Sequence, residues 1–499
     1  MRVSGTATRR ESAAWRYKHR PGTVPADGRR LRDDGAGLFH RTTTNRIARV
    51  SIGNERPTDG NGFAGGRSEV GSWCLPAFAP DWRLEPFWKN AVSRQQVEFL
   101  FLNIGHFLDH LFMLVFATAA ALILARDWGM SYAELIPYAT PGFIAFAACS
   151  IPAGWIADKW SRKGMMAIFF IGIGLSAIAT AAAQTPLQMA FALLAIGVFA
   201  AIYHPVGLSM VVHGRQKTGV PLAVNGISGN LGVASAALIT GLLIDTTGWR
   251  SAFIAPGIVS TAIGLAYIGF VISTREPEAQ ASGAAPTGKA RVPETPAIDR
   301  RVLVRLFAII FFSTAVGGLV FQSTTFALPK VFDERLLTMA GTATLVGWYA
   351  FAVFTLAAFA QLVVGYLVDH HSVRTVFAFV AGLQAVFFAS MYQLTGIAAL
   401  VVSVGFMLVV FGQIPINDVL VARATKTEFR SRVYALRYVV TFFVSATAVP
   451  LIAWIHANWG FSSLFLVLAL AAAAILGAVL MLPRTGAVLG TAPVAVKAD

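Results

Sequence analysis

The chain has 499 residues, of which 56% are hydrophobic and only 13% are charged, and its mean hydropathy is +0.63. Soluble globular domains carry about 25% charged residues, so this composition excludes an ordinary soluble domain. The net charge of +15 first suggests a nucleic-acid partner. However, residues 1–91 alone hold 16 Lys and Arg against 9 Asp and Glu, and much of the remaining charge falls between apolar runs. We therefore expect no nucleic-acid partner.

The N-terminal segment 1–92 is rich in Arg, Gly and Pro and shows no sustained hydrophobic period. It lacks the apolar core and small-residue cleavage site of a signal peptide. Two interpretations stay open. The segment is either a disordered basic tail or the artefact of a start site placed too early, with the true start near residue 92.

From about residue 93 to 484, apolar runs of roughly 20 residues follow one another. Each can cross a hydrocarbon core about 30 Å thick as a helix. Helices are the default because the backbone must satisfy its own hydrogen bonds in lipid. The sequence predicts an all-α integral membrane protein with about 12 transmembrane helices, over residues 97–125, 136–157, 164–183, 187–212, 220–244, 251–272, 302–328, 344–368, 373–393, 398–421, 433–457 and 460–482.

Basic residues are distributed unevenly between alternate loops. One set of loops holds 17 Lys and Arg, whereas the other set, near residues 126, 250 and 330–335, holds 4. Because basic loops stay on the cytoplasmic side, we expect a multi-pass protein of the cell membrane, the inner membrane of a bacterium, with both termini in the cytoplasm.

The second half of the apolar region repeats landmarks of the first. "GWIADKWSRK" begins at Gly154 and "GYLVDHHSVR" begins at Gly365, 211 residues later. A spacing of 210 residues relates Pro205 to Pro415, and also Trp249 to Trp459. Two six-helix repeats around a membrane-normal axis, with the substrate site between them, are typical of one large class of transporters.

These repeats define the expected domains. A six-helix bundle over 93–272 and a second over 302–484 are separated by a cytoplasmic linker, 273–301, that is polar and rich in Pro, Ala and Gly. Residues 485–499 are expected to form a cytoplasmic tail.

The stretch "GWIADKWSRK" resembles the signature loop between helices 2 and 3 of the major facilitator superfamily, in which an Asp follows a Gly by four residues and precedes a basic pair. Glycine allows close helix approach, and the Asp can accept hydrogen bonds from the N-terminus of a neighbouring helix. The resemblance implies the major facilitator fold, in two six-helix bundles, and a gating and structural role for Gly154, Asp158, Arg162 and Lys163 and, in the second copy, Gly365, Asp369 and Arg374.

Several segments within residues 103–253 resemble the fosmidomycin-resistance-like branch of that superfamily. They are "GHFLDH", "GMSYAEL", "IYHP" and "GISGNLG". The branch implies export of a drug or metabolite. Two features of many drug/proton antiporters are missing: "LLAIGVFAA" (193–201) has no Arg, and "GVASAAL" (232–238) has no Gly-Pro. These departures call for another proton-binding group.

The first predicted helix carries a polar face at its front. Asn103, His106, Asp109 and His110 lie within about 120° of one another at 100° per residue, and residues 111–125 are almost wholly apolar. Ionisable groups inside a membrane normally face the bundle interior and mark a proton or substrate path. Histidine titrates near neutral pH, so this cluster is a candidate proton carrier. The alternative is a polar face that only fixes helix packing, or a helix end at the interface.

Further candidates lie on later helices. Pro205 kinks its helix and gives His204 a polar neighbourhood, although a plain kink is the alternative. Asp418 either belongs to the cavity or caps the cytoplasmic end near Arg423. The remaining cavity candidates are Gln322, Gln361, Gln413 and Asn417.

The stretch "HFLDH" also has the His-x-x-x-His spacing of a membrane di-iron enzyme. Such sites need about eight clustered imidazoles, and the 9 histidines of this chain are scattered. We expect no enzyme, no metal and no cofactor. The prediction is a monomeric secondary transporter, driven by protons, that exports a small molecule; the alternative is proton-coupled uptake of a small organic solute.

Overall fold

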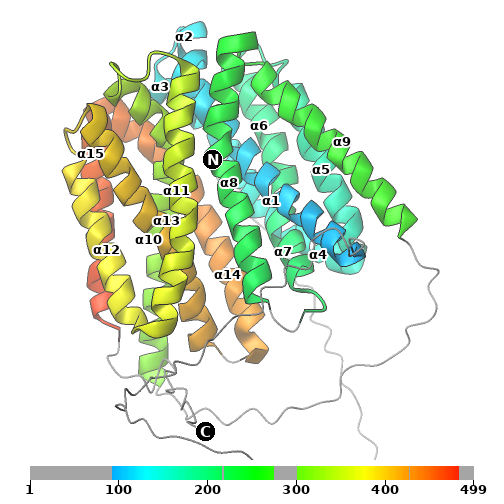
Figure 1. Cartoon of the computed structure of the whole chain (residues 1–499), viewed down its shortest axis with the longest axis vertical. Coiled ribbons are helices and arrows are strands. Elements are labelled where there is room, and N and C mark those ends of the chain that lie inside the picture. Colours follow the sequence, from blue (N-terminus) through cyan, green and yellow to red (C-terminus); the bar gives the residue numbers. More distant parts are fainter. Residues whose placement is uncertain (1–92, 216–217, 275–299, 426, 483–499) are drawn as a thin grey trace, which may run out of the picture. The chain divides into compact units, whose positions relative to one another are not determined.

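The computed structural model describes residues 93–215, 218–274, 300–425 and 427–482, and in these residues the chain is folded into helices (Figure 1). The segment 1–92, nearly all of the linker 273–301 and the tail 485–499 lie outside the described residues. The first half forms α1 Arg94–Ala119, η1 Ala120–Leu124, α2 Ala125–Asp127, α3 Tyr132–Leu135, η2 Ile136–Ala139, α4 Thr140–Lys159, α5 Arg162–Thr180, α6 Pro186–Ala200, η3 Tyr203–Gly207, α7 Leu208–Val212, α8 Gly219–Thr247 and α9 Ser251–Ser273.

The second half consists of six further helices. They are α10 Arg300–Arg335, α11 Ala343–His370, α12 Val373–Ser390, α13 Gly396–Ala424, α14 Thr427–Ala446 and α15 Ala448–Leu480.

Within the described residues, 11 segments are long and apolar enough to cross a membrane, which confirms the all-α membrane fold. The predicted number was twelve, and the difference arises at the last segment. Leu436–Leu480 counts as one span of 45 residues, about twice the roughly 20 residues that one crossing needs. The predicted helices 433–457 and 460–482 lie almost wholly within it, and Gly460 breaks it with a φ of +71°. The prediction split the segment at this kink, whereas a count of continuous helices joins the two parts.

Side-chain caps set where many of the helices begin. Ser131 accepts a hydrogen bond from the backbone N–H of Glu134, whose carboxylate accepts from the backbone N–H of Ser131 in return. This capping box starts α3 within the motif "GMSYAEL". Side chains also cap α1, α5, α6 and α11, through Ser93, Ser161, Thr185 and Thr342.

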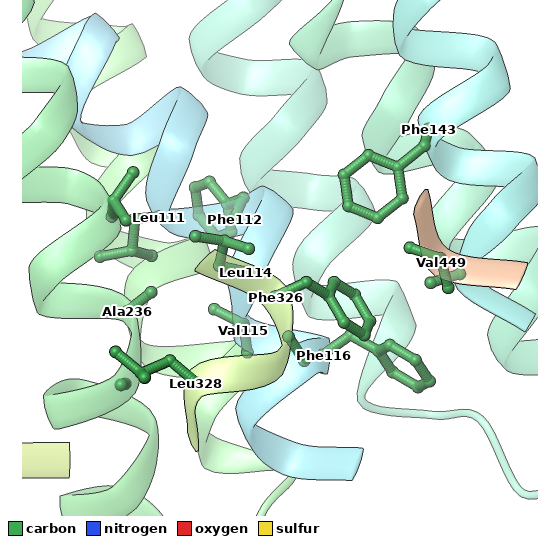
Figure 2. Packing of buried hydrophobic residues seen from close by; sticks show 14 of the residues in the cluster. Leu111, Phe112, Leu114, Val115, Phe116, Phe143, Ala236, Phe326, Leu328 and Val449 are labelled. Carbon is green, nitrogen blue, oxygen red and sulfur yellow. The ribbon is translucent and has the colours of Figure 1, made fainter. Parts of the chain in front are cut away.

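The first helix is the most enclosed of the spans. In its most apolar stretch of 18 residues, 72% is buried inside the protein. The corresponding stretches of the other described spans are between 28% and 56% buried. Figure 2 shows Leu111, Phe112 and Phe116 of α1 among Ala236 of α8 and Phe326 of α10. Polar groups on α1 are therefore screened from lipid by neighbouring helices.

Glycines allow particular helices to meet backbone to backbone. A Cβ atom at Gly197 of α6 would lie 2.0 Å from the carbonyl oxygen of Gly142 in α4. A Cβ atom at Gly241 of α8 would lie 2.2 Å from the carbonyl oxygen of Ala343, at the start of α11. Small residues at such contacts are the usual means of packing helices in membranes.

The contact between α8 and α11 also carries a polar link between the two halves of the chain. The carboxylate of Asp245, near the end of α8, accepts hydrogen bonds from the backbone N–H groups of Ala343 and Thr344 at 3.3 and 2.7 Å. An acidic side chain at a helix N-terminus satisfies free N–H groups and the helix dipole.

The Gly197 contact makes a stability prediction. Gly197→Ala should lower the midpoint of thermal unfolding in detergent, because overpacking costs about 1–3 kcal/mol. Gly382→Ala is the matched control, since a Cβ atom at Gly382 of α12 would meet no atom within 4 Å, and the change should be neutral or stabilising by up to about 1 kcal/mol. Equal midpoints for the two variants would show that α4 and α6 do not pack as described.

Candidate functional site

The structure brings the predicted cluster on α1 together with His204. The ring centroids of His106, His110 and His204 lie 5.0, 5.3 and 5.5 Å from one another. The carboxylate of Asp109, which is 0% exposed, has an oxygen 3.4 Å from Nε2 of His204. This contact is within ion-pair distance but lacks hydrogen-bond geometry. One buried carboxylate, one buried imidazole and two half-buried imidazoles thus share a site between α1 and η3.

A break in the fourth span positions His204. The helix α6 ends at Ala200, and after a short turn the π-helical segment Tyr203–Gly207 leads into α7. Pro205 lies in this segment and has no N–H to donate, which agrees with the predicted interruption. Gly154 of α4 makes room for the proline, because a Cβ there would lie 3.2 Å from Cβ of Pro205. Such π-helical turns are frequent at functional sites.

The orientation of the His106 ring is set by α8. Its Nδ1 donates to the carbonyl oxygen of Asn225 at 2.7 Å. A carbonyl only accepts, so Nδ1 carries a hydrogen and Nε2 is the nitrogen that keeps a lone pair when the ring is neutral. That Nε2 is buried and has no hydrogen-bond partner among the described residues. Gly229 leaves space for it, since a Cβ at this position would lie 2.6 Å from Nε2.

Two residues of this site were missed by the sequence analysis, Tyr203 and Asn225. The hydroxyl of Tyr203 donates to the carbonyl oxygen of Leu102 at 2.7 Å. Nδ2 of Asn225 donates to that hydroxyl at 2.8 Å and to Oδ1 of Asn103 at 3.0 Å. The Tyr203 ring stacks on His106 with centroids 4.7 Å apart. The sequence did contain a signal for each residue, because both are polar groups inside apolar runs. Tyr203 directly precedes "HP", and Asn225 directly precedes "GISGNLG".

Aromatic side chains from both halves of the chain surround His204. Phe146 of α4 lies 5.7 Å from it between ring centroids, and Phe442 and Tyr438 of α14 lie 5.1 and 6.1 Å away. The cluster belongs to the first half, but one of its imidazoles therefore faces the second half.

The amide candidates of the second half are distributed differently. Gln413 accepts from Gln384 at 2.9 Å and donates to the carbonyl oxygen of Ser313 at 3.4 Å, so it links α13 to α12 and α10. Gln361 is placed at the α8–α11 contact, with Oε1 3.9 Å from a Cβ built on Gly226. Gln322 and Asn417 are both buried, and each has a polar atom without a hydrogen-bond partner among the described residues.

Asp418 is paired with an arginine of another helix. It accepts a hydrogen bond from Arg437 of α14, a side chain that is 5% exposed. Arg423 instead donates to the carbonyl oxygen of Val368 at 3.1 Å and lies 3.9 Å from Asp369. Asp418 thus links α13 to α14, and its two alternative roles, in the cavity or as a cap at the helix end, stay predictions.

The signature loop is held by local ion pairs. Asp158 accepts hydrogen bonds from Arg162 at 2.9 and 3.3 Å, four residues along the chain, whereas a neighbouring helix N-terminus was the expected donor. Lys163 lies 3.9 Å from Glu98 of α1. The second copy differs: Arg374 donates to the carbonyl oxygen of Leu480 at 2.6 Å. A Cβ at Gly365 would meet no atom within 4 Å, so that glycine is not needed for close packing.

Comparison with known proteins agrees with this architecture. The chain is 24% identical to a gallate transporter of Pseudomonas putida over 299 residues, which is 54% of this chain and 65% of that protein. It is 30% identical over 128 residues to a puromycin resistance protein of Streptomyces alboniger, covering 25% of each chain. The crystal structure of a D-xylose–proton symporter superposes with a TM-score of 0.62 at 13% identity, over 79% of this chain and 99% of the symporter.

The chain spans about two thirds or less of the curated relatives it matches, so these similarities assign no substrate. The family model extends much further. The model of the Major Facilitator Superfamily matches residues 102–342 and 337–494. This chain therefore belongs to the major facilitator superfamily and is a secondary transporter, not an enzyme.

Proposed function

We propose that this transporter is proton-coupled and exports a small organic molecule by alternating access, as a monomer in the bacterial inner membrane with both termini in the cytoplasm. One observation carries the proposal: Asp109, with 0% exposure inside a membrane span, has its carboxylate 3.4 Å from His204. An ionisable group at that depth is costly and marks a proton or substrate path. Histidine exchanges protons near neutral pH, so the pair can take up and release a proton during each cycle.

Alternating access requires two parts that move against each other. We propose that these parts are the bundles 93–272 and 302–484. The Asp245 cap on α11 and the packing of Phe442 against His204 are contacts between them. A change in the charge of the Asp109–His204 pair would alter the second of these contacts directly, which links protonation to bundle movement.

Export is favoured by the resemblance to the fosmidomycin-resistance-like branch and by the similarity to a puromycin resistance protein. The second candidate is uptake of a small organic solute. Of the two curated relatives described above, the gallate transporter matches over the longer stretch, and the same proton step would serve uptake. The direction of proton movement relative to substrate separates the two candidates in proteoliposomes.

The gating role of the signature loop can be tested by Asp158→Asn and Arg162→Ala. Both break an exposed ion pair at a helix end, outside the histidine site. We expect turnover to fall several-fold while substrate binding changes little, because the loop sets the balance between the two access states. Asp127→Asn, another exposed carboxylate, is the control and should behave as wild type. Unchanged turnover with weakened binding would contradict the gating role.

The central test concerns Asp109. Asp109→Asn should abolish pH-gradient-driven net transport but leave exchange at equal pH largely intact, because only the coupled step needs the carboxylate. His204→Ala should alter the pH dependence of transport. The measurement uses proteoliposomes with an internal pH dye and a compound panel that begins with gallate and puromycin, with Asp127→Asn as control. If Asp109→Asn kept full gradient-driven accumulation and an unchanged pH profile, this proposal would fall.

A further inference from the structure

We propose that His106, His110 and His204 form a binding site for a divalent transition-metal ion of the zinc type, with Asp109 as the adjacent carboxylate. Each histidine can offer one ring nitrogen, and these three nitrogens all lie within 4.8 Å of one another. This replaces the expectation from sequence that the chain has no metal site.

The ligand set selects the class of ion. Imidazole nitrogen suits Zn²⁺, Cu²⁺ and Ni²⁺, whereas Mg²⁺ and Ca²⁺ prefer oxygen. Zinc is commonly held by three protein ligands with a fourth position open. Tetrahedral Zn–N bonds of about 2.1 Å place the ligand nitrogens about 3.4 Å apart. The nitrogens are at most 4.8 Å apart in the structure, so each nitrogen–nitrogen distance must shorten by about 1.4 Å or less. Rotation of the side chains on α1 and η3 can supply this closure.

The site is partly preorganised. The hydrogen bond from Nδ1 of His106 to the carbonyl oxygen of Asn225 fixes the tautomer that leaves Nε2 with its lone pair. Metal-binding histidines usually donate their other ring N–H to such an acceptor. Nε2 of His106 and both ring nitrogens of His204 are buried without hydrogen-bond partners among the described residues. A metal ion would bind the lone pair of such a nitrogen and so replace the missing hydrogen bond.

The charge balance also favours a cation. Both carboxylate oxygens of Asp109 are buried without hydrogen-bond partners among the described residues. A divalent ion held by neutral imidazoles would place positive charge beside this carboxylate, which lowers the cost of keeping it in a membrane span. All four side chains come from α1 and η3, so metal binding needs neither the second bundle nor substrate. Metal binding can therefore be measured without transport, and the inference goes beyond the proposed transport cycle.

Equilibrium metal binding to the purified full chain tests the proposal. The protein carries an affinity tag without histidine and is first stripped with a chelator. We expect one Zn²⁺ per chain by calorimetry, and one Co²⁺ with the visible spectrum of a four- or five-coordinate site. X-ray absorption at the zinc edge of the wild-type protein should show imidazole ligands, and this measurement does not depend on any variant folding.

Variants then locate the site. His106→Ala, His110→Ala and His204→Ala should each raise the Kd for Zn²⁺ by at least about 100-fold, more than the loss of an outer partner costs. His213→Ala and His370→Ala, which change exposed histidines elsewhere, should leave it unchanged.

A second pair of variants keeps every ligand. Gly229→Ala should weaken Zn²⁺ binding about 10-fold by crowding Nε2 of His106. Gly226→Ala on the same helix should not, because its Cβ would have 3.9 Å of clearance. No Zn²⁺ bound to wild type, or binding unaffected by all three histidine variants, would overturn the proposal. Proton coupling is measured separately in chelator-treated vesicles, so either proposal can fail without the other.

Discussion

A carboxylate inside a membrane span is the constraint around which this part of the molecule is arranged. Asp109 is completely buried in α1, and burial of a charge without a partner costs several kcal/mol. His204 comes within 3.4 Å of it because η3 replaces a regular helical turn. The most enclosed of the described spans thus carries a fully buried carboxylate, with an imidazole from the fourth span beside it.

The same geometry connects the signature loop to the site. Gly154 opens the loop motif and packs against Pro205, the residue after His204, while Asp158 lies one helical turn further along α4. The last two turns of α4 therefore contact the residue after His204 and carry Asp158, the carboxylate of the Asp158–Arg162 ion pair.

Hydrophobic run length predicted the spans well because the bilayer sets a minimum length for each of them. It also divided 433–457 from 460–482 at the place where Gly460 breaks the helix. In the site, helical periodicity correctly grouped Asn103, His106, Asp109 and His110, since all are on one helix. It could not pair Asp418 with Arg437 or place Asn225 beside His106, because such contacts depend on how separate helices pack. Tyr203 was missed for a related reason: its place beside His204 and Pro205 was a local signal, but its hydrogen bond to a backbone carbonyl of α1 depends on how two helices pack.

The two proposals for the histidine cluster use the same atoms. A proton carrier needs a free lone pair on an imidazole nitrogen, and so does a metal ligand, so metal affinity and protonation are linked. With His106 held by Asn225, the orientation of one imidazole is fixed before either ligand arrives. His204 is held less firmly, with only the Asp109 ion-pair contact and aromatic neighbours around it among the described residues. Those neighbours include Phe442 of α14, which belongs to the second half of the chain. Binding of a proton or a metal ion would therefore affect the second half through the contact of His204 with Phe442.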